Sequence, residues 1–253
     1  MKQRLELVDS IRGMAIISMI FYHACWIMCF FGILITNDMM SSNAFIIWQK
    51  SICITFITIS GFSFSLGNRK LRNGLMVLGI GVAITVLSLL FLYELRDIFG
   101  ILWLIGICTL IMIPLDKYIC SFLINKKKIT IILMILSVVL YITTRNMNYG
   151  YINIFGNIFN LPKGLYRNII TTLIGFMMPT FYSVDYFSIF PWCFLYFAGY
   201  CFHKIIKDSD FERGFLAKGI PFLKYIGKHS LKIYVIHPVV IYIMCIIVTM
   251  VRR

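Results

Sequence analysis

Long apolar runs separated by short polar segments make up most of this 253-residue chain. About 20 apolar residues cross the hydrocarbon core of a bilayer as a helix, and seven runs approach or exceed that length. They lie at 11–35, 44–66, 73–93, 99–116, 129–145, 187–206 and 230–250. A shorter apolar stretch at 165–181 predicts a re-entrant or interfacial helix. The pattern therefore predicts an all-α polytopic membrane protein with about seven transmembrane helices and this short additional helix.

The distribution of charge supports this fold class and predicts an orientation. The chain is 60% apolar and 13% charged, with a net charge of +14. Its basic residues gather in alternate connections, chiefly at 69–72, 126–128 and 204–232, as the positive-inside rule describes. The charge therefore indicates cytoplasmic loops rather than a nucleic-acid partner. We expect a multi-pass protein of the cell (plasma) membrane, a single domain over 1–253, with its N-terminus in the cytoplasm and its C-terminus outside.

The most unusual polar residue is His23, which stands in the middle of the first apolar run. Eleven positions separate it from Arg12. That spacing puts both side chains on nearly the same helix face, roughly 16 Å apart along the axis. An ionisable group near the bilayer midplane is costly and is often functional. The alternative is a core histidine that is hydrogen-bonded to a neighbouring helix, and the sequence favours neither interpretation.

A buried, neutral imidazole at His23 could act as a general base or attack a thioester as a nucleophile. Either role needs a group that orients the ring. The strongest candidate is Asp185, which could instead bind an acceptor hydroxyl or cap the sixth transmembrane helix. Asp38 is a weaker candidate. His237, which precedes Pro238 inside the last apolar run, could line a cavity.

Three arginines on the predicted cytoplasmic side are candidates for binding an anionic ligand. Arg69 and Arg72 precede the third helix, where they could form a fork for phosphate groups. Arg12 could face an anionic ligand that enters from the cytoplasm. Positive-inside anchoring is the alternative for all three residues. Asp9, three residues before Arg12, is well placed to cap the first helix.

The cysteines do not indicate a disulfide framework or a metal centre. There are eight, and most fall inside apolar runs, where cysteine behaves as a small hydrophobic residue. Cys25 and Cys29 are one helical turn apart but have no further ligands nearby in the sequence, so we expect no metal. The loop at 146–185 has the Asn, Tyr and Gly content to contact a polar ligand such as a sugar, although these are also ordinary loop residues.

Several motifs in order resemble the transmembrane acyltransferase superfamily. Each motif is moderately specific, and their order and spacing over nearly the whole chain are stronger. They are Arg4-x-x-x-x-Asp9-x-x-Arg12-Gly13 followed after ten residues by His23, Ser60-Gly61-Phe62 followed by Arg69-x-x-Arg72, and the segment from Ile226 to His237. The segments Phe99-Gly100-Ile101-Leu102-Trp103 and Asp185-Tyr186-Phe187-Ser188-Ile189-Phe190-Pro191-Trp192 resemble the branch with the heparan-α-glucosaminide N-acetyltransferase catalytic domain. The acyltransferase family 3 O-acetyltransferases are similar at a greater distance.

The resemblance implies transfer of an acyl group from cytoplasmic acetyl-CoA, or another acyl-CoA, to a glycan or glycolipid on the far side of the membrane. By this analogy His23 is the catalytic histidine, and Arg69 and Arg72 hold the CoA phosphates near Arg12. A homodimer is one oligomeric state that the resemblance suggests. The branch has a histidine where this chain has Trp103, which puts a second catalytic imidazole in doubt.

Our first hypothesis is therefore an integral membrane N- or O-acyltransferase in which His23 is the base or the acyl carrier. Arg12, Arg69 and Arg72 would position the acyl-CoA, and Asp185 would orient His23 or the acceptor. A second hypothesis is a transporter or flippase of a lipid-linked or anionic substrate, with His23 as a proton relay. A third is a catalytically silent membrane scaffold that keeps the fold.

Overall fold

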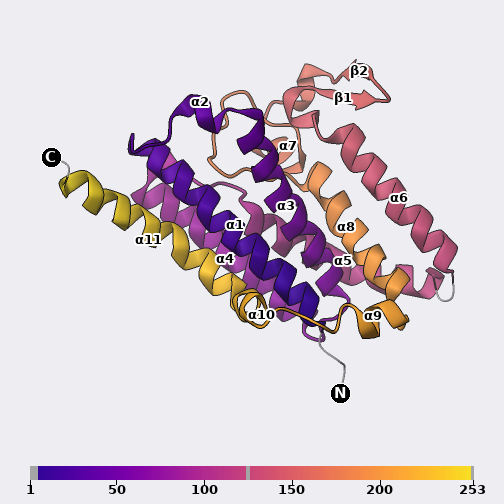
Figure 1. Cartoon of the computed structure of the whole chain (residues 1–253). Coiled ribbons are helices and arrows are strands. Elements are labelled where there is room, and N and C mark those ends of the chain that lie inside the picture. The colour runs from indigo at the N-terminus through magenta and orange to yellow at the C-terminus, as the bar shows by residue number, and fades with distance from the viewer. Residues whose placement is uncertain (1–4, 124–125, 252–253) are drawn as a thin grey trace. The chain divides into compact units, whose positions relative to one another are not determined.

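The computed structural model describes residues 5–123 and 126–251. Within these ranges the chain is mostly helical, with one antiparallel hairpin (Figure 1). The helices are α1 (Glu6–Phe30), α2 (Asn37–Met40), α3 (Asn43–Phe64), α4 (Lys70–Phe91), α5 (Ile101–Leu123), α6 (Lys127–Thr144), α7 (Ile169–Ile174), α8 (Ile189–Ile206), α9 (Asp210–Gly214), α10 (Pro221–Lys228) and α11 (Ser230–Val251). The strands are β1 (Tyr151–Ile154) and β2 (Asn157–Asn160), and the 3-10 turns are η1 (Tyr93–Leu95), η2 (Met147–Tyr149) and η3 (Lys163–Leu165).

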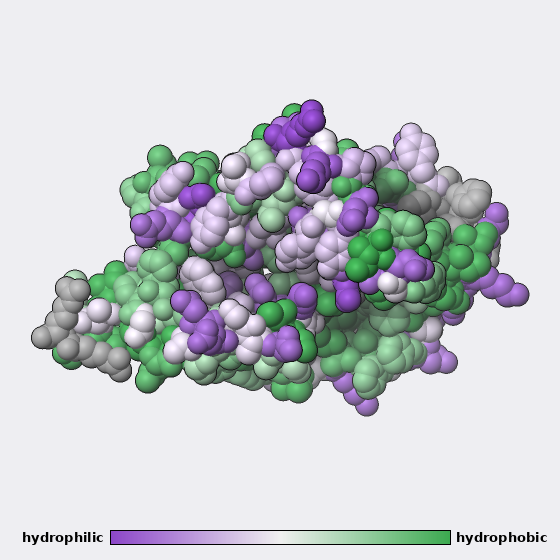
Figure 2. Space-filling model, turned by 90° about the horizontal axis from the view of Figure 1, so that it is seen from above, coloured by the Kyte–Doolittle hydropathy of each residue, from purple (hydrophilic) through white to green (hydrophobic). Residues whose placement is uncertain are grey.

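In the described part of the chain, the predicted spans are confirmed as seven helices that are long and apolar enough to cross a membrane. They are α1, α3, α4, α5, α6, α8 and α11. Their outer surfaces remain rich in exposed apolar side chains, and such side chains occupy much of the surface in Figure 2. Lipid can solvate this surface, whereas water could not without a large cost in free energy. The chain is therefore an all-α, multi-pass membrane protein.

The connection between α6 and α8 is more structured than the sequence indicated. It contains the β1–β2 hairpin, in which Tyr151 pairs with Asn160. Phe155 and Gly156 form its turn with positive φ angles of 49° and 93°, as a tight two-residue hairpin turn requires. The predicted helix at 165–181 is confirmed only over the 6 residues of α7, which ends at Ile174 and is followed by Gly175 with a φ of 144°.

The chain forms two compact units. The first contains Met1–Phe56 and Ile206–Arg253, and the second contains Ile57–Ile205. The boundary falls within α3 and at the last residue of α8. Each unit has its own close helix packing, which positions a different group of polar side chains.

In the first unit, α10 packs tightly against the first part of α1, and α11 lies beside α1 as well (Figure 1). Two glycines make the close approach possible. A Cβ atom at Gly13 would lie 2.0 Å from the carbonyl oxygen of Leu223, and one at Gly227 would lie 1.8 Å from that of Asp9. In membranes, such small residues let helix backbones touch and gain dispersion energy.

In the second unit, α8 crosses the end of α3, and glycines again allow the two backbones to approach closely. A Cβ atom at Gly61 would lie 1.8 Å from the carbonyl oxygen of Tyr196, and one at Gly199 would lie 2.0 Å from that of Thr58. The neighbouring helices α4 and α5 also pack side by side. This unit therefore brings parts of α3, α4, α5 and α8 together.

We expect Gly13→Ala to destabilise the protein, because the added methyl would occupy the position of a backbone carbonyl. Overpacking of this kind costs about 1–3 kcal/mol. Gly79→Ala is the matched control, since a Cβ atom there meets nothing within 4 Å. Alanine at this helical position should be neutral or stabilising by about 0.5–1 kcal/mol. Thermal unfolding in detergent would measure both, and equal melting temperatures would contradict the packing argument.

Candidate active site

His23 on α1 lies directly against His237 on α11 in the first unit. Nδ1 of His23 is 2.7 Å from Nε2 of His237. The ring centroids are 4.9 Å apart and the ring planes differ by 12°. The two imidazoles therefore lie side by side in nearly one plane, which suits a short and well-aligned hydrogen bond. The structure thus identifies His237 as the neighbour that orients His23.

A second hydrogen bond, from His237 to the backbone, determines which nitrogen of each ring carries the proton. Nδ1 of His237 lies 3.0 Å from the carbonyl oxygen of Ile233, which can only accept a hydrogen bond. In neutral His237 the proton is therefore on Nδ1 and the lone pair on Nε2. Nδ1 of His23 must donate to that lone pair, which leaves Nε2 of His23 as a proton acceptor. This nitrogen bonds to no side chain or backbone group among the described residues.

Pro238 adds a further polar group beside the His237 ring. Proline has no backbone N–H, so the carbonyl of Tyr234 loses its usual helical partner. The His237 ring interacts with the Tyr234 carbonyl as well as with that of Ile233. Pro238 thereby leaves one carbonyl, that of Tyr234, without its helical donor beside an imidazole inside an apolar helix. The His237-Pro238 dipeptide was the sequence signal for this contact, although the sequence did not identify its partner.

Arg12 lies on the same helix as His23 and pairs with Asp9. Its Nη1 atom is 3.1 Å from Oδ1 of Asp9, and the Arg12 side chain is 21% exposed. The prediction that Asp9 caps α1 is wrong, because the helix begins at Glu6 and Leu5 holds the cap position. Asp9 instead lies within the first turn. Its carboxylate there interacts favourably with the positive end of the helix dipole and pairs with Arg12.

Arg69 and Arg72 lie in the second unit at the start of α4. Arg69 holds the N-cap position and makes no side-chain cap, and both residues are exposed. Among the described residues, neither guanidinium has an ion-pair or hydrogen-bond partner. The first turn of α4 contains no acidic residue, so these cations lie at the positive end of a helix dipole. An anion bound there would relieve this unfavourable arrangement.

Asp185 also lies in the second unit, where it faces another acid. It precedes the first residue of α8 by four positions, too early for the predicted alternative role of a helix cap. Burial raises the pKa of Asp97 well above its ordinary value, and the neighbouring Asp185 carboxylate raises that pKa further. Oδ1 of Asp97 is buried and accepts no hydrogen bond from the described residues. Two carboxylates this close cannot both ionise cheaply, so Asp97 favours its neutral form.

Backbone hydrogen bonds hold these two acids together. The amide of Val184 donates to the carbonyl of Arg96 at 3.1 Å, and the amide of Phe187 donates to that of Phe99 at 2.8 Å. Gly100 provides the room, since a Cβ atom there would lie 2.4 Å from Oδ1 of Asp97. The carboxyl pair is therefore fixed by the loops that precede α5 and α8.

The structure thus divides the predicted site residues into two groups. His23 and Arg12 belong to the first unit, and Arg69, Arg72 and Asp185 belong to the second. Trp103, at the position where the resembled branch has a histidine, is buried near the start of α5, with its ring 4.9 Å from that of Phe99. Of the sequence motifs, Arg4 lies outside the described residues.

A comparison with protein families gives one match over nearly the whole chain. The family model described as heparan-alpha-glucosaminide N-acetyltransferase, catalytic, matches residues 4–239. This range includes His23, His237, the three arginines and Asp185. No curated protein and no solved structure matches the chain.

The Asp97–Asp185 pair predicts a pH dependence of stability. The pKa of Asp97 is higher in the folded chain than in the unfolded chain, so its contribution to stability is present at low pH. That contribution is lost as the pH rises from the ordinary carboxyl pKa through the raised one. Asp97→Asn, which mimics the neutral acid, should remove this loss and gain stability relative to wild type as the pH rises from about 4. Melting temperatures across pH would measure the effect.

Asp38→Asn provides the control, since Asp38 is an exposed residue in the first turn of α2. The same relative gain in both variants would show that the pH effect reflects net charge and not the carboxyl pair.

Proposed function

Because the chain belongs to the heparan-alpha-glucosaminide N-acetyltransferase catalytic family, we propose that it is an acyltransferase whose catalytic base or acyl carrier is His23. It would move an acetyl or other short acyl group from cytoplasmic acyl-CoA to an amine or hydroxyl of an extracytoplasmic glycan or glycolipid. The observation that carries this proposal is the His23–His237 hydrogen bond of 2.7 Å inside two apolar helices.

The hydrogen-bond chain favours chemistry at Nε2 of His23. This nitrogen has the lone pair, while Nδ1 donates to His237. In a direct transfer, Nε2 would take the proton of the acceptor as the acceptor oxygen or nitrogen attacks the thioester carbonyl. The C–S bond then breaks, and the protonated His23 returns a proton to the CoA thiolate. The products are the acylated acceptor and free CoA, and general-base help of this kind contributes about 10²–10⁴-fold to the rate.

The same pair also supports a covalent route. Nε2 of His23 would attack the thioester carbonyl and release CoA thiolate, which leaves an acyl-imidazolium. The Nδ1 proton could then move along the 2.7 Å hydrogen bond to Nε2 of His237. A neutral acyl-imidazole would remain, ready to transfer its acyl group to the acceptor, and the proton held by His237 would neutralise the thiolate. Direct transfer and the acyl-histidine route use the same two residues and differ in the intermediate.

The remaining site residues would bind the two substrates. Arg69 and Arg72, which are exposed at the start of α4, suit the phosphate groups of the acyl-CoA donor. Arg12, which pairs with Asp9 in the first unit, is a further candidate for binding an anionic group of a substrate. Asp185 is then better suited to the acceptor, since a carboxylate can accept a hydrogen bond from an acceptor hydroxyl or amine.

The proposal predicts that His23→Ala abolishes acyl transfer without loss of the fold. Membranes with matched amounts of each variant would receive radiolabelled acetyl-CoA, and label would be followed into protein, glycolipid and polymer. Wild type should transfer label at least about 10²-fold faster than His23→Ala. His229→Ala is the matched control, because among the described residues the His229 side chain hydrogen-bonds to the carbonyl of Tyr225, at 2.9 Å, and to no other group. Equal labelling in wild type and His23→Ala would contradict the role of His23.

His237 is expected to act through His23, and graded substitutions would test this. In His237→Gln, the amide oxygen can still accept the hydrogen bond from Nδ1 of His23, but it cannot take up the proton. In His237→Leu that acceptor is missing. We expect turnover in the order wild type, Gln and Leu, with a loss of at least about tenfold for Leu and little change in the KM for acyl-CoA. A rise in KM with unchanged turnover would instead place His237 in substrate binding.

A further inference from the structure

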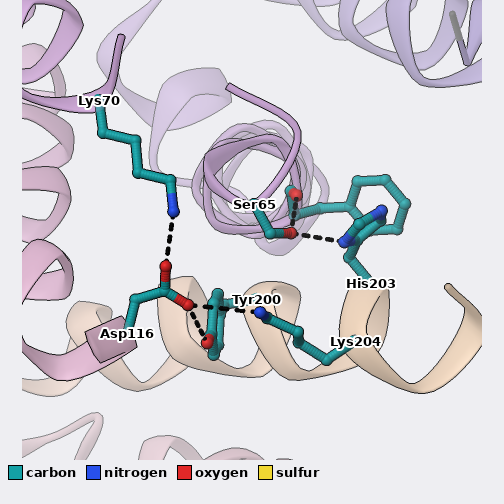
Figure 3. Close-up of polar contacts among 7 residues, drawn as sticks. Ser65, Lys70, Asp116, Tyr200, His203 and Lys204 are labelled. Carbon is teal, nitrogen blue, oxygen red and sulfur yellow. Dashed lines mark hydrogen bonds and ion pairs between the residues drawn. The ribbon is translucent and has the colours of Figure 1, made fainter. Parts of the chain in front are cut away.

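A second polar cluster joins three helices of the second unit. Figure 3 shows Lys70 of α4 and Lys204 of α8 pointing toward the carboxylate of Asp116 on α5. Nζ of Lys70 is 2.5 Å from Oδ2 of Asp116, and Nζ of Lys204 is 3.4 Å from Oδ1. The hydroxyl of Tyr200 donates to Oδ1 at 2.5 Å. One carboxylate thus holds two ammonium groups that come from different helices.

The charges in this cluster do not balance. Two lysines carry two positive charges and Asp116 carries one negative charge, so the cluster keeps a net positive charge. Lys70 is also the first residue of α4, directly after Arg69 and two positions before Arg72. The dipole of α4 adds positive potential at this end. The cluster and the start of α4 together form a strongly electropositive region built from α4, α5 and α8.

The two ammonium groups are held in place but remain accessible. Nζ of Lys70 lies 4.4 Å from the centre of the Phe64 ring, and Nζ of Lys204 lies 5.2 Å from that of Tyr200. Both lysine side chains are 27% exposed. An ammonium has three donors, and among the described residues Lys70 bonds only to Asp116. Lys70 therefore keeps donors for a second anion.

A role limited to joining the three helices does not account for the second lysine of this cluster. Partly exposed ion pairs contribute about 0–1 kcal/mol each, and a single lysine would balance Asp116. The positive-inside rule accounts for cations near the ends of membrane helices. It does not account for two lysines from separate helices that meet at one carboxylate, beside two arginines that have no counter-ion among the described residues.

We propose that Lys70 and Lys204 bind a phosphate group of the acyl-CoA donor and that Asp116 holds both ammonium groups in position while the site is empty. This inference rests on the proposed acyltransferase function and adds a phosphate site to it. A phosphate oxygen would accept hydrogen bonds from the remaining donors of the Lys70 ammonium, and its negative charge would be attracted to both ammonium groups. Arg69 and Arg72, close by in sequence at the start of α4, would bind the neighbouring phosphates. Asp116 competes with the phosphate for the same donors, so binding is reversible.

The inference can be tested by measuring how tightly the purified protein binds CoA and pantetheine. Pantetheine has the thiol arm of CoA but no phosphate. Lys70→Met and Lys204→Met should each weaken CoA binding about tenfold or more and leave pantetheine binding unchanged. Asp116→Asn should strengthen CoA binding, because it removes the competing carboxylate. Lys117→Met is the control, since Lys117 is exposed on the same helix as Asp116.

The lysine variants and Asp116→Asn are expected to change the affinity for CoA in opposite directions. If the cluster only ties three helices together, Asp116→Asn will leave CoA affinity unchanged or lower it, and this overturns the inference even where a lysine variant fails to fold. Wild-type affinity for CoA in both lysine variants also overturns it, while the acyltransferase proposal stands. If those variants keep CoA affinity but lose binding to phosphatidylglycerol vesicles, the phosphate belongs to lipid and the donor assignment is wrong. No CoA binding by wild type overturns both proposals.

Discussion

The structure depends on one constraint of the bilayer, namely that a polar group in hydrocarbon must find its partner within the protein. His23 meets this requirement with His237, and His237 meets it with the carbonyl of Ile233. The indole N–H of Trp48 likewise finds a partner within the protein, since it donates to the hydroxyl of Ser18 at 2.7 Å. Such contacts fix which helix faces meet, because any other pairing would leave a buried donor or acceptor unsatisfied.

Close packing of helices makes these contacts geometrically available. Apolar side chains gain little by leaving lipid for a helix interface, so association depends on backbone proximity and dispersion. The reciprocal contacts at Gly13 and Gly227, and at Gly61 and Gly199, bring helix backbones into direct contact. The first pair holds α1 in the unit that also contains α11, and so supports the helix from which His23 extends. The glycine contacts therefore help to position the helix that carries His23.

The spans could be predicted from sequence because each depends on a local property, an apolar run of sufficient length. The hydrogen-bond partner of His23 could not, because 214 positions separate His23 from His237 and only helix packing joins them. The sequence favoured Asp185, since a carboxylate is the usual partner of a catalytic imidazole, yet the structure gives His23 a second imidazole. The β1–β2 hairpin was missed because Phe155-Gly156 is a weaker turn signal than Asn-Gly. The cap at Asp9 was wrong because α1 begins about one turn earlier than the apolar run, at Glu6, so Asp9 lies inside the helix.

A pair of imidazoles has a consequence that an imidazole–carboxylate pair would not share. A carboxylate beside His23 would carry a permanent negative charge into the apolar interior, which is costly without a cation. Two neutral imidazoles carry none, and their hydrogen bond still fixes the tautomer that leaves Nε2 of His23 available. The pair can hold one added proton, whereas a second would place two cations 2.7 Å apart at the facing nitrogens. In the proposed mechanism the site would therefore be charged only while acyl transfer is under way, which suits a base inside a membrane.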